Sequence, residues 1–155
     1  MSRAFVREPE GGEAFEDLPD RPISHHHLVT SAGLAFMDAE IVSLEQRLAE
    51  AQAADDKAEI ARLSRDLRYW SARRVSAEVV PAPTDTSHIR FGARVTFERE
   101  DGRRQTYRIV GEDEADPAKG SLSYVSPLAQ AMMGKEVGDT IAVGQTTAEI
   151  IAIEI

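Results

Sequence analysis

The sequence predicts an α+β protein in which an antiparallel helical hairpin precedes a small antiparallel β domain with one short helix. Apolar residues recur at steps of three and four between positions 34 and 70, and Ala53-Ala54-Asp55-Asp56 interrupts them as a turn. After residue 88, apolar and polar residues alternate and glycines mark the turns. We therefore expect an acidic, disordered tail (1–29), a helical-hairpin arm (30–80), a linker (81–87) and a C-terminal domain (88–155).

Each expected helix of the arm has one apolar face. Thr30 is suited to cap the first helix, and Val80-Pro81 ends the second. The two faces consist of Leu34, Met37, Ile41, Leu44, Leu48 and Ala51, and of Ile60, Leu63, Leu67 and Trp70. Because neither helix would be stable alone, we expect packing between these faces to hold the hairpin together.

Five strands and one helix are expected in the C-terminal domain. Asp101-Gly102 forms the turn between the first two strands, Ser126 caps the helix with Pro127 in its first turn, and Gly134 ends it. The strands are expected around Val95 and Phe97, and at Tyr107–Val110, Ser121–Val125, Thr140–Val143 and Ala148–Ile155.

Composition narrows the classes of function. The chain has 155 residues, a net charge of −9 and no cysteine, so disulfides and thiol chemistry are excluded. Proteins that bind duplex DNA by themselves concentrate Lys and Arg, and no segment here does so. We therefore expect a protein partner and no independent sequence-specific DNA binding. No apolar run is long enough to span a membrane and no signal peptide is evident, so we expect a cytoplasmic location.

The run Arg108–Asp139, RIVGEDEADPAKGSLSYVSPLAQAMMGKEVGD, has a strand, an acidic turn, a second strand and a Ser-Pro helix start in succession. With its surroundings, from Phe91 to Ile155, it resembles the C-terminal domain of the bacterial GreA/GreB transcript-cleavage factors. The preceding hairpin resembles the arm of that family, and Arg68-Tyr69-Trp70 is similar to the Arg-Tyr-Leu of GreB-like members.

The resemblance implies an FKBP-like C-terminal domain and a transcription elongation regulator that binds RNA polymerase at its secondary channel. It implies that the Ser126-Pro127 turn, with Val125 beside it, contacts the rim of that channel. The acidic turn, which contains Asp113 and Asp116, is either part of the same partner surface or a solvated loop. Such a protein is not an enzyme, since at most it stimulates the RNA cleavage of the polymerase itself.

Three carboxylates, Asp55, Asp56 and Glu59, lie at the expected tip of the hairpin. Acid-x-x-acid spacing at a helix start is typical of capping. The resemblance implies a second interpretation, because the family has Asp-x-x-Glu-Asn at this place and uses its acids to help hold a polymerase Mg²⁺ ion during RNA cleavage. Ile60 replaces the Asn here. On either interpretation we expect no cofactor and no stably bound metal in the protein itself.

The expected arm is about one heptad per helix shorter than in typical members, which withdraws the tip by roughly 10–15 Å. We therefore favour a non-cleaving regulator that competes with other Gre-type factors for the channel over a cleavage stimulator. A basic face on the second helix either contacts the nascent RNA 3′ end, as in the family, or is simply solvated. It comprises Arg62, Arg65, Arg68 and Arg73.

Two further interpretations receive less weight. An FKBP-like fold allows a prolyl isomerase, but the aromatic lining of such a pocket would have to come from residues expected in the core, namely Phe91, Phe97, Tyr107 and Tyr124. The histidines His25, His26 and His27 are adjacent in sequence and cannot all converge on one ion, so we expect a polar linker in preference to a metal site.

Overall fold

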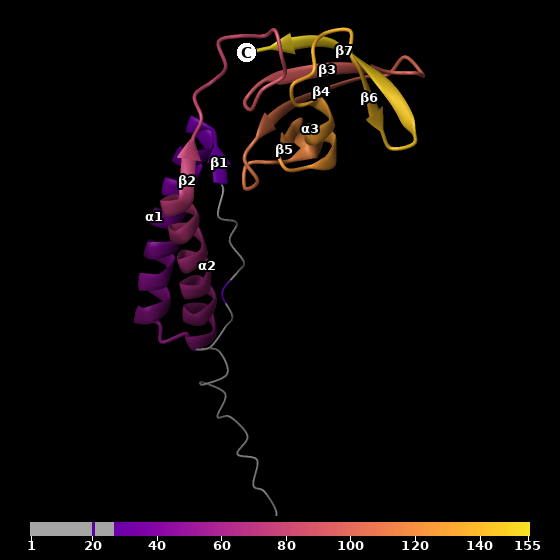
Figure 1. The fold of residues 1–155 in the computed structure, drawn as a ribbon. Helices are drawn as coiled ribbons and strands as arrows, with labels where there is room; N and C mark the ends of the chain where they lie inside the picture. The colour runs from indigo at the N-terminus through magenta and orange to yellow at the C-terminus, as the bar shows by residue number, and fades with distance from the viewer. Residues whose placement is uncertain (1–19, 21–26) are drawn as a thin grey trace, which may run out of the picture. The chain divides into compact units, whose positions relative to one another are not determined.

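The computed structural model describes Asp20 and residues 27–155, whose elements are drawn in Figure 1. The described chain divides into two compact units. The hairpin unit consists of Asp20 and residues 36–76, and the sheet unit consists of residues 27–35 and 77–155. No helix among the described residues is both long enough and apolar enough to cross a membrane.

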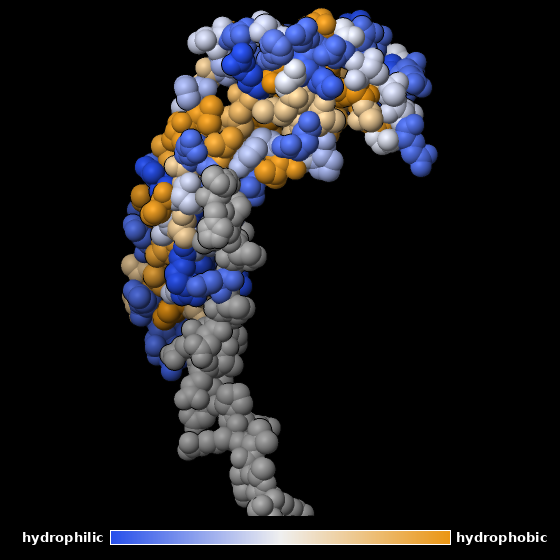
Figure 2. All heavy atoms as spheres, viewed as in Figure 1, coloured by the Kyte–Doolittle hydropathy of each residue, from blue (hydrophilic) through white to orange (hydrophobic). Residues whose placement is uncertain are grey.

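Two helices, α1 (Ser31–Ala53) and α2 (Lys57–Ser76), form the expected antiparallel hairpin (Figure 1). Leu44, Ala51 and Leu63 are buried between them, and four partly buried residues pack around these three: Leu48, Ile60, Leu67 and Trp70. These residues belong to the predicted apolar faces, so the expected seam is confirmed. Figure 2 shows apolar residues, in orange, between hydrophilic ones along the outside of the helices, and Phe36 and Val42 are indeed about half exposed.

The turn between the helices is closed by the end of α1. The amide of Asp55 donates to the carbonyl of Gln52 at 3.2 Å, and the amide of Asp56 donates to the carbonyl of Ala51 at 3.0 Å. This is the Schellman arrangement, which requires a left-handed residue after the helix. Asp55 takes that conformation with φ of +52° and is the only described non-glycine residue with positive φ.

The sheet unit contains a five-stranded sheet in the order β5-β4-β3-β7-β6. Its strands are β3 (Arg94–Arg99), β4 (Arg104–Val110), β5 (Ser121–Ser123), β6 (Thr140–Val143) and β7 (Thr146–Glu154). The predicted antiparallel sheet is confirmed for three of its four strand pairs, and at one edge β5 runs parallel to β4. The connection between them includes the 3-10 helix η2 (Pro117–Lys119) and returns the chain to the level of Arg108, so β5 starts in the same direction as β4.

One helix, α3 (Pro127–Met132), packs on this sheet and helps to close its core. Ala129 and Met132 of α3 are fully buried in the same cluster as Phe97, Ile109 and Ile150 of the strands. The alternation of Val95 and Phe97 toward the core is confirmed. Between Thr96 and Phe97 the pairing with β7 shifts register at an irregularity.

A second, two-stranded sheet shows that the predicted bounds of the arm are wrong at both ends. His27–Val29 form β1, although we expected the tail to extend through residue 29, and β1 pairs in parallel with β2 (Ala77–Val79). The second helix was expected to continue to residue 80, but it ends at Ser76. The amide of Leu28 also donates to the Tyr124 hydroxyl at 3.3 Å, so these strands are held by partners distant in sequence.

The predictions for the tail and for the histidines concern, in part, residues that the structure does not describe. Residues 1–19 and 21–26 of the predicted tail, and with them His25 and His26, lie outside the described residues. For His27 the prediction of a polar linker is wrong, because this residue is buried in β1. The expected linker, residues 81–87, falls within a stretch from 80 to 93 that contains no helix or strand.

Candidate functional site

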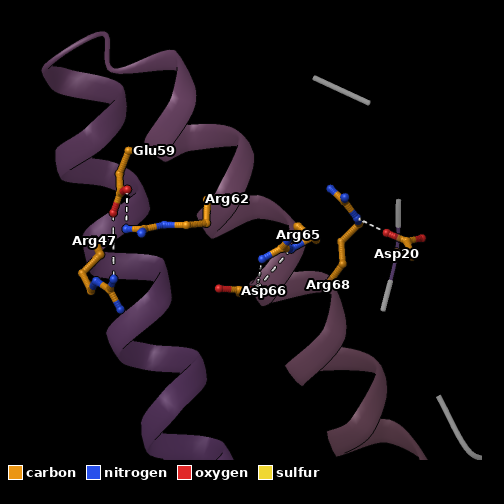
Figure 3. A network of polar contacts seen from close by, with 7 residues as sticks. All are labelled: Asp20, Arg47, Glu59, Arg62, Arg65, Asp66 and Arg68. Carbon is orange, nitrogen blue, oxygen red and sulfur yellow. Dashed lines mark hydrogen bonds and ion pairs between the residues drawn. The ribbon is translucent and has the colours of Figure 1, made fainter. Parts of the chain in front are cut away.

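The acidic tip of the hairpin is arranged as a helix start. Asp56 Oδ1 accepts a hydrogen bond from the amide of Glu59 at 3.2 Å, as an N-cap residue does. The Glu59 carboxylate forms an ion pair with Arg62 and lies 3.9 Å from Arg47 Nη2 of the other helix (Figure 3). Both acids that match the family motif are therefore engaged in local contacts that stabilise the tip.

The three tip carboxylates do not form a cation site. Within Asp20 and residues 27–155, no three or more His, Cys, Asp or Glu side chains are grouped so that they could hold a metal ion. Mg²⁺ binds hard oxygen ligands at about 2.0–2.1 Å and usually retains several waters. A cation bound by Glu59 would have to draw that carboxylate away from Arg62 and Arg47.

Three of the four predicted arginines form a row along α2. Arg62, Arg65 and Arg68 follow one another at steps of three residues, and their side chains are 54%, 32% and 49% exposed. Each contacts an acid (Figure 3): Arg62 pairs with Glu59, Arg65 with Asp66 at 3.3 Å, and Arg68 with Asp20 at 2.7 Å. We call Arg62, Arg65 and Arg68 the arginine row.

Arg73 does not belong to this exposed row. It is 2% exposed, and its guanidinium carbon lies 6.0 Å from the centre of the Tyr69 ring. Here the predicted basic face is wrong, because the packing changes near the end of α2. Tyr69 and Trp70 meet edge to face there with ring centres 5.3 Å apart, and Trp70 meets Phe36 in the same way at 5.7 Å.

The Ser-Pro turn presents a fixed surface on the sheet unit. Ser126 caps α3, since its hydroxyl accepts a hydrogen bond from the amide of Ala129 at 3.3 Å, and Pro127 is the first helical residue. The Gln130 side chain donates to the carbonyl of Tyr124 at 2.6 Å and holds the turn from its other side. Val125 is 51% exposed, and Pro127 is also exposed. An apolar residue and a rigid turn are thus available to a partner.

The acidic turn divides into exposed and engaged carboxylates. The Asp116 side chain is 47% exposed. That of Asp113 is only 11% exposed and lies 3.4 Å from Nε2 of His27, which is itself buried. Asp116 therefore remains available to a partner, whereas Asp113 contributes to holding β1.

Glu114 is a structural residue that the sequence analysis missed. Its carboxylate accepts hydrogen bonds from the amides of Thr30 and Gly111, both at 3.0 Å, and from the Thr30 hydroxyl. Thr30 itself caps α1, because its hydroxyl accepts a hydrogen bond from the amide of Gly33 at 3.0 Å. The acidic turn thus joins the sheet to the start of α1. The available sequence signal was Gly33, because a glycine in the first turn of a helix suggests that something approaches the backbone closely.

The aromatic residues of the sheet unit line no isomerase pocket. Phe91 and Phe97 are 6% and 0% exposed, and Tyr107 and Tyr124 pack against the same core. Phe91 meets Tyr124 edge to face at 5.5 Å, and Phe97 stacks on Tyr107 at 6.1 Å. Phe91 also lines a hollow of about 450 Å³ beside residues 80–85 and Arg90, but the other three rings do not line it, so the four do not surround a common opening.

Comparison with known proteins adds independent findings. A family model described as "Transcription elongation factor, GreA/GreB, C-term" matches residues 84–155. The chain is 35% identical to transcription elongation factor GreA of Ruegeria pomeroyi over 149 residues, which covers 81% of this chain and 96% of that protein. It is 36% identical to GreB of Pseudomonas aeruginosa over 135 residues, with coverage of 75% and 80%. A match to GreA of Desulfovibrio desulfuricans is 41% identical over 93 residues and spans only 57% of that relative.

Proposed function

Because this chain belongs to the GreA/GreB family of transcription elongation factors, we propose that it binds bacterial RNA polymerase at the secondary channel and regulates elongation with little stimulation of transcript cleavage. The observation that carries the second half of this proposal is the engagement of Asp56 and Glu59 in capping and ion pairing at the tip. On this proposal the protein is not an enzyme, and any Mg²⁺ at its tip belongs to the polymerase complex.

The sheet unit offers the surface for docking. Val125, Ser126 and Pro127 lie on a turn fixed by hydrogen bonds, so a partner that contacts them loses little conformational freedom of the loop. Asp116 adds an exposed negative charge, which suits a basic patch on the partner. Asp113 contributes through β1 and not through direct contact.

Arm length supports the non-cleaving role. The 23 residues of α1 and the 20 of α2 correspond to helices of about 34 and 30 Å at 1.5 Å per residue. The alignment with the Ruegeria pomeroyi protein runs over 149 residues, whereas 81% of the 155 residues of this chain is about 126. This chain is therefore the shorter of the two across their shared region, which is compatible with the shortened arm proposed here.

The side-chain contacts of the tip also favour a non-cleaving role, because they hold its carboxylates away from a metal ion. A carboxylate helps to hold Mg²⁺ only when its oxygens reach the ion, and the attacking and leaving oxygens need two metals about 3.5–4 Å apart. Glu59 would first have to leave two arginines, and Asp56 would have to release the amide that it caps. Ile60, which follows Glu59, supplies no polar group to assist either change.

The test is an RNA cleavage assay on a backtracked elongation complex. The purified protein is added with Mg²⁺ to RNA polymerase that carries end-labelled RNA, and the RNA is resolved on a gel. We expect intact RNA, together with protection of that RNA when a full-length GreA of another bacterium is added afterwards. Shortened RNA with a released 3′ fragment would overturn the non-cleaving role, and intact RNA without protection would overturn channel binding.

Two variants separate docking from tip chemistry. Asp56→Ala with Glu59→Ala removes both tip acids, and we expect it to protect the RNA as well as the unmodified protein does. Val125→Arg introduces a positive charge at the proposed docking turn, at a side chain that is 51% exposed, and we expect it to lose protection. If the tip variant loses affinity for the polymerase and Val125→Arg does not, docking does not reside in the sheet unit.

A further inference from the structure

Helix α2 is strongly positive in a chain whose net charge is −9. Its residues comprise six cations and two anions, a net charge of +4. The cations are Lys57, Arg62, Arg65, Arg68, Arg73 and Arg74, and the anions are Glu59 and Asp66. The arginine row accounts for three of these cations at regular steps, whereas Arg73 is buried and Arg74 lies farther along the helix, where it pairs with Asp38 on α1 at 2.6 Å.

The N-terminal sequence has the opposite charge. Residues 8–20, EPEGGEAFEDLPD, contain six acids and no basic residue. The described member of this segment is Asp20, and its carboxylate accepts a hydrogen bond from Arg68 Nε at 2.7 Å across 48 residues of sequence (Figure 3). One end of an acidic segment is therefore placed at one end of the arginine row.

We propose that residues 8–20 bind the arginine row as an internal acidic ligand, with the contact between Asp20 and Arg68 as its anchor. The distance along α2 from Arg68 to Arg62 is about 9 Å, because six residues rise 1.5 Å each. An extended chain covers about 3.3–3.6 Å per residue, so three or four residues span the row. On this proposal Asp17 and Glu16, three and four residues before Asp20 in the sequence, are the acids close enough to span to Arg65 and Arg62.

A hollow on α2 suits the apolar residues of the same segment. Its volume is about 410 Å³. It is lined by Asp55, Lys57, Ile60, Ala61, Ser64 and Arg68. Ile60 and Ala61 give it an apolar wall beside Arg68, and Phe15 and Leu18 lie among the acids of the segment. The segment thus carries apolar side chains beside its acids, and the hollow offers an apolar wall beside Arg68 for them to contact.

Exposed ion pairs are individually weak and are screened by salt, so this contact is reversible. Covalent attachment compensates for this weakness, because a short tether gives the segment an effective concentration in the millimolar range. The family resemblance implies that this basic face contacts the nascent RNA 3′ end, and for a factor with the function proposed above the segment then competes with RNA phosphates for the same guanidinium groups. Carboxylates and phosphates both accept the paired hydrogen bonds that arginine offers.

The contact is measured with a pair of spin labels, because the chain contains no cysteine of its own. Ala14→Cys and Ala58→Cys place one label in the segment and one near the tip end of α2, and neither changes a charge. We expect a short, narrow distance distribution at low salt that broadens at high salt. The matched variant carries Glu13→Gln, Glu16→Gln, Asp17→Asn and Asp20→Asn. We expect it to show the broad distance distribution at both low and high salt. Identical distributions in the two proteins would overturn the proposal.

Competition is measured separately as binding of a labelled single-stranded RNA oligonucleotide to the full chain. We expect the segment variant, with its four acids neutralised, to bind RNA about tenfold more tightly. A control neutralises four exposed acids of the sheet unit, Glu78, Glu100, Glu136 and Glu149, and has the same net charge. We expect the RNA affinity of this control to rise by less than about threefold. Equal gains in RNA affinity would overturn competition. A short label distance without any RNA binding would retain the contact between the segment and the arginine row but refute the RNA contact that the family resemblance implies for this face.

Discussion

Replacing Gly33 with alanine tests whether Glu114 holds the start of α1. A Cβ atom at position 33 would lie 2.5 and 2.6 Å from the two carboxylate oxygens of Glu114, too close for either atom to stay in place. The backbone of α1 is rigid, whereas the end of a glutamate side chain is flexible, so Glu114 is the group that moves. It then leaves the amides of Thr30 and Gly111 without their acceptor.

The expected change in the free energy of unfolding follows from these contacts. A buried amide that loses its acceptor costs about 1–3 kcal/mol, and because both sites are only partly buried we take about 1 kcal/mol for each. Alanine is about 1 kcal/mol more favourable than glycine inside a helix. Gly33→Ala should therefore destabilise the protein by about 1 kcal/mol net, and Glu114→Ala by about 2 kcal/mol. In the Glu114→Ala background the obstruction is gone, so Gly33→Ala should instead stabilise by about 1 kcal/mol.

The assay is urea unfolding of the four proteins of this double-mutant cycle, with amide hydrogen exchange at Thr30 and Gly111 as a local measurement. Gly111→Ala is the control, because its Cβ would lie 2.7 Å from the backbone carbonyl of Leu28 as well as from Glu114. Removing Glu114 cannot relieve that backbone contact, so this variant should be destabilised in both backgrounds. If Gly33→Ala has the same sign and size in both backgrounds, Glu114 does not occupy the space that glycine leaves.

Three shorter predictions concern the hairpin and the Ser-Pro turn. Asp55→Gly should raise the free energy of unfolding by about 1 kcal/mol, because glycine adopts the left-handed conformation without strain, and a lower melting temperature would contradict this. Ser126→Ala should cost about 1 kcal/mol through loss of the α3 cap, measured by urea unfolding, and Ser126→Asp should restore most of it. Leu63→Ala should cost about 2–5 kcal/mol and reduce helical circular dichroism, whereas Val75→Ala, at 87% exposure, should change stability by less than about 0.5 kcal/mol; similar losses in both would show that the seam does not hold the hairpin.

The helical hairpin was predictable because its signal is long and local. Apolar residues repeat at helical spacing along each helix, and the turn between the helices contains no large apolar residue. Thr30 at the start of α1 and Ser126 at the start of α3 were predictable for a similar reason, since a cap acts within three residues of itself. Each of these elements is specified by residues close to it in sequence.

The strands of the two-stranded sheet were not predictable in this way. His27–Val29 are only three residues, and their partner in the sheet begins at Ala77, 50 positions later. Nothing within such a short segment distinguishes a strand from a tail, because the stabilising contacts are all distant in sequence. The parallel direction of β5 has the same origin, since it depends on the path of the connection through η2 and not on the residues of the strand.

Charge alone did not separate the roles of the carboxylates. Within four residues of one turn, Asp113 pairs with a buried histidine, Glu114 holds two backbone amides, and Asp116 is about half exposed. A list of acidic residues would treat them as equivalent candidates for partner binding. Only the position of their partners shows that two of them stabilise the fold.

On the proposed function, the local contacts of the tip oppose metal binding there. Glu59 matches the family motif in residue type and spacing, yet its carboxylate already pairs with arginines from both helices of the hairpin. A bound metal must therefore compensate for the loss of those pairs before it contributes to catalysis, in addition to spanning any gap left by a shorter arm. If an arm of full length were grafted onto this chain and still failed to promote cleavage until Arg62 and Arg47 were replaced by Gln, the local ion pairs and not the reach would be the controlling factor. Cleavage that returned on lengthening alone would assign the control to reach.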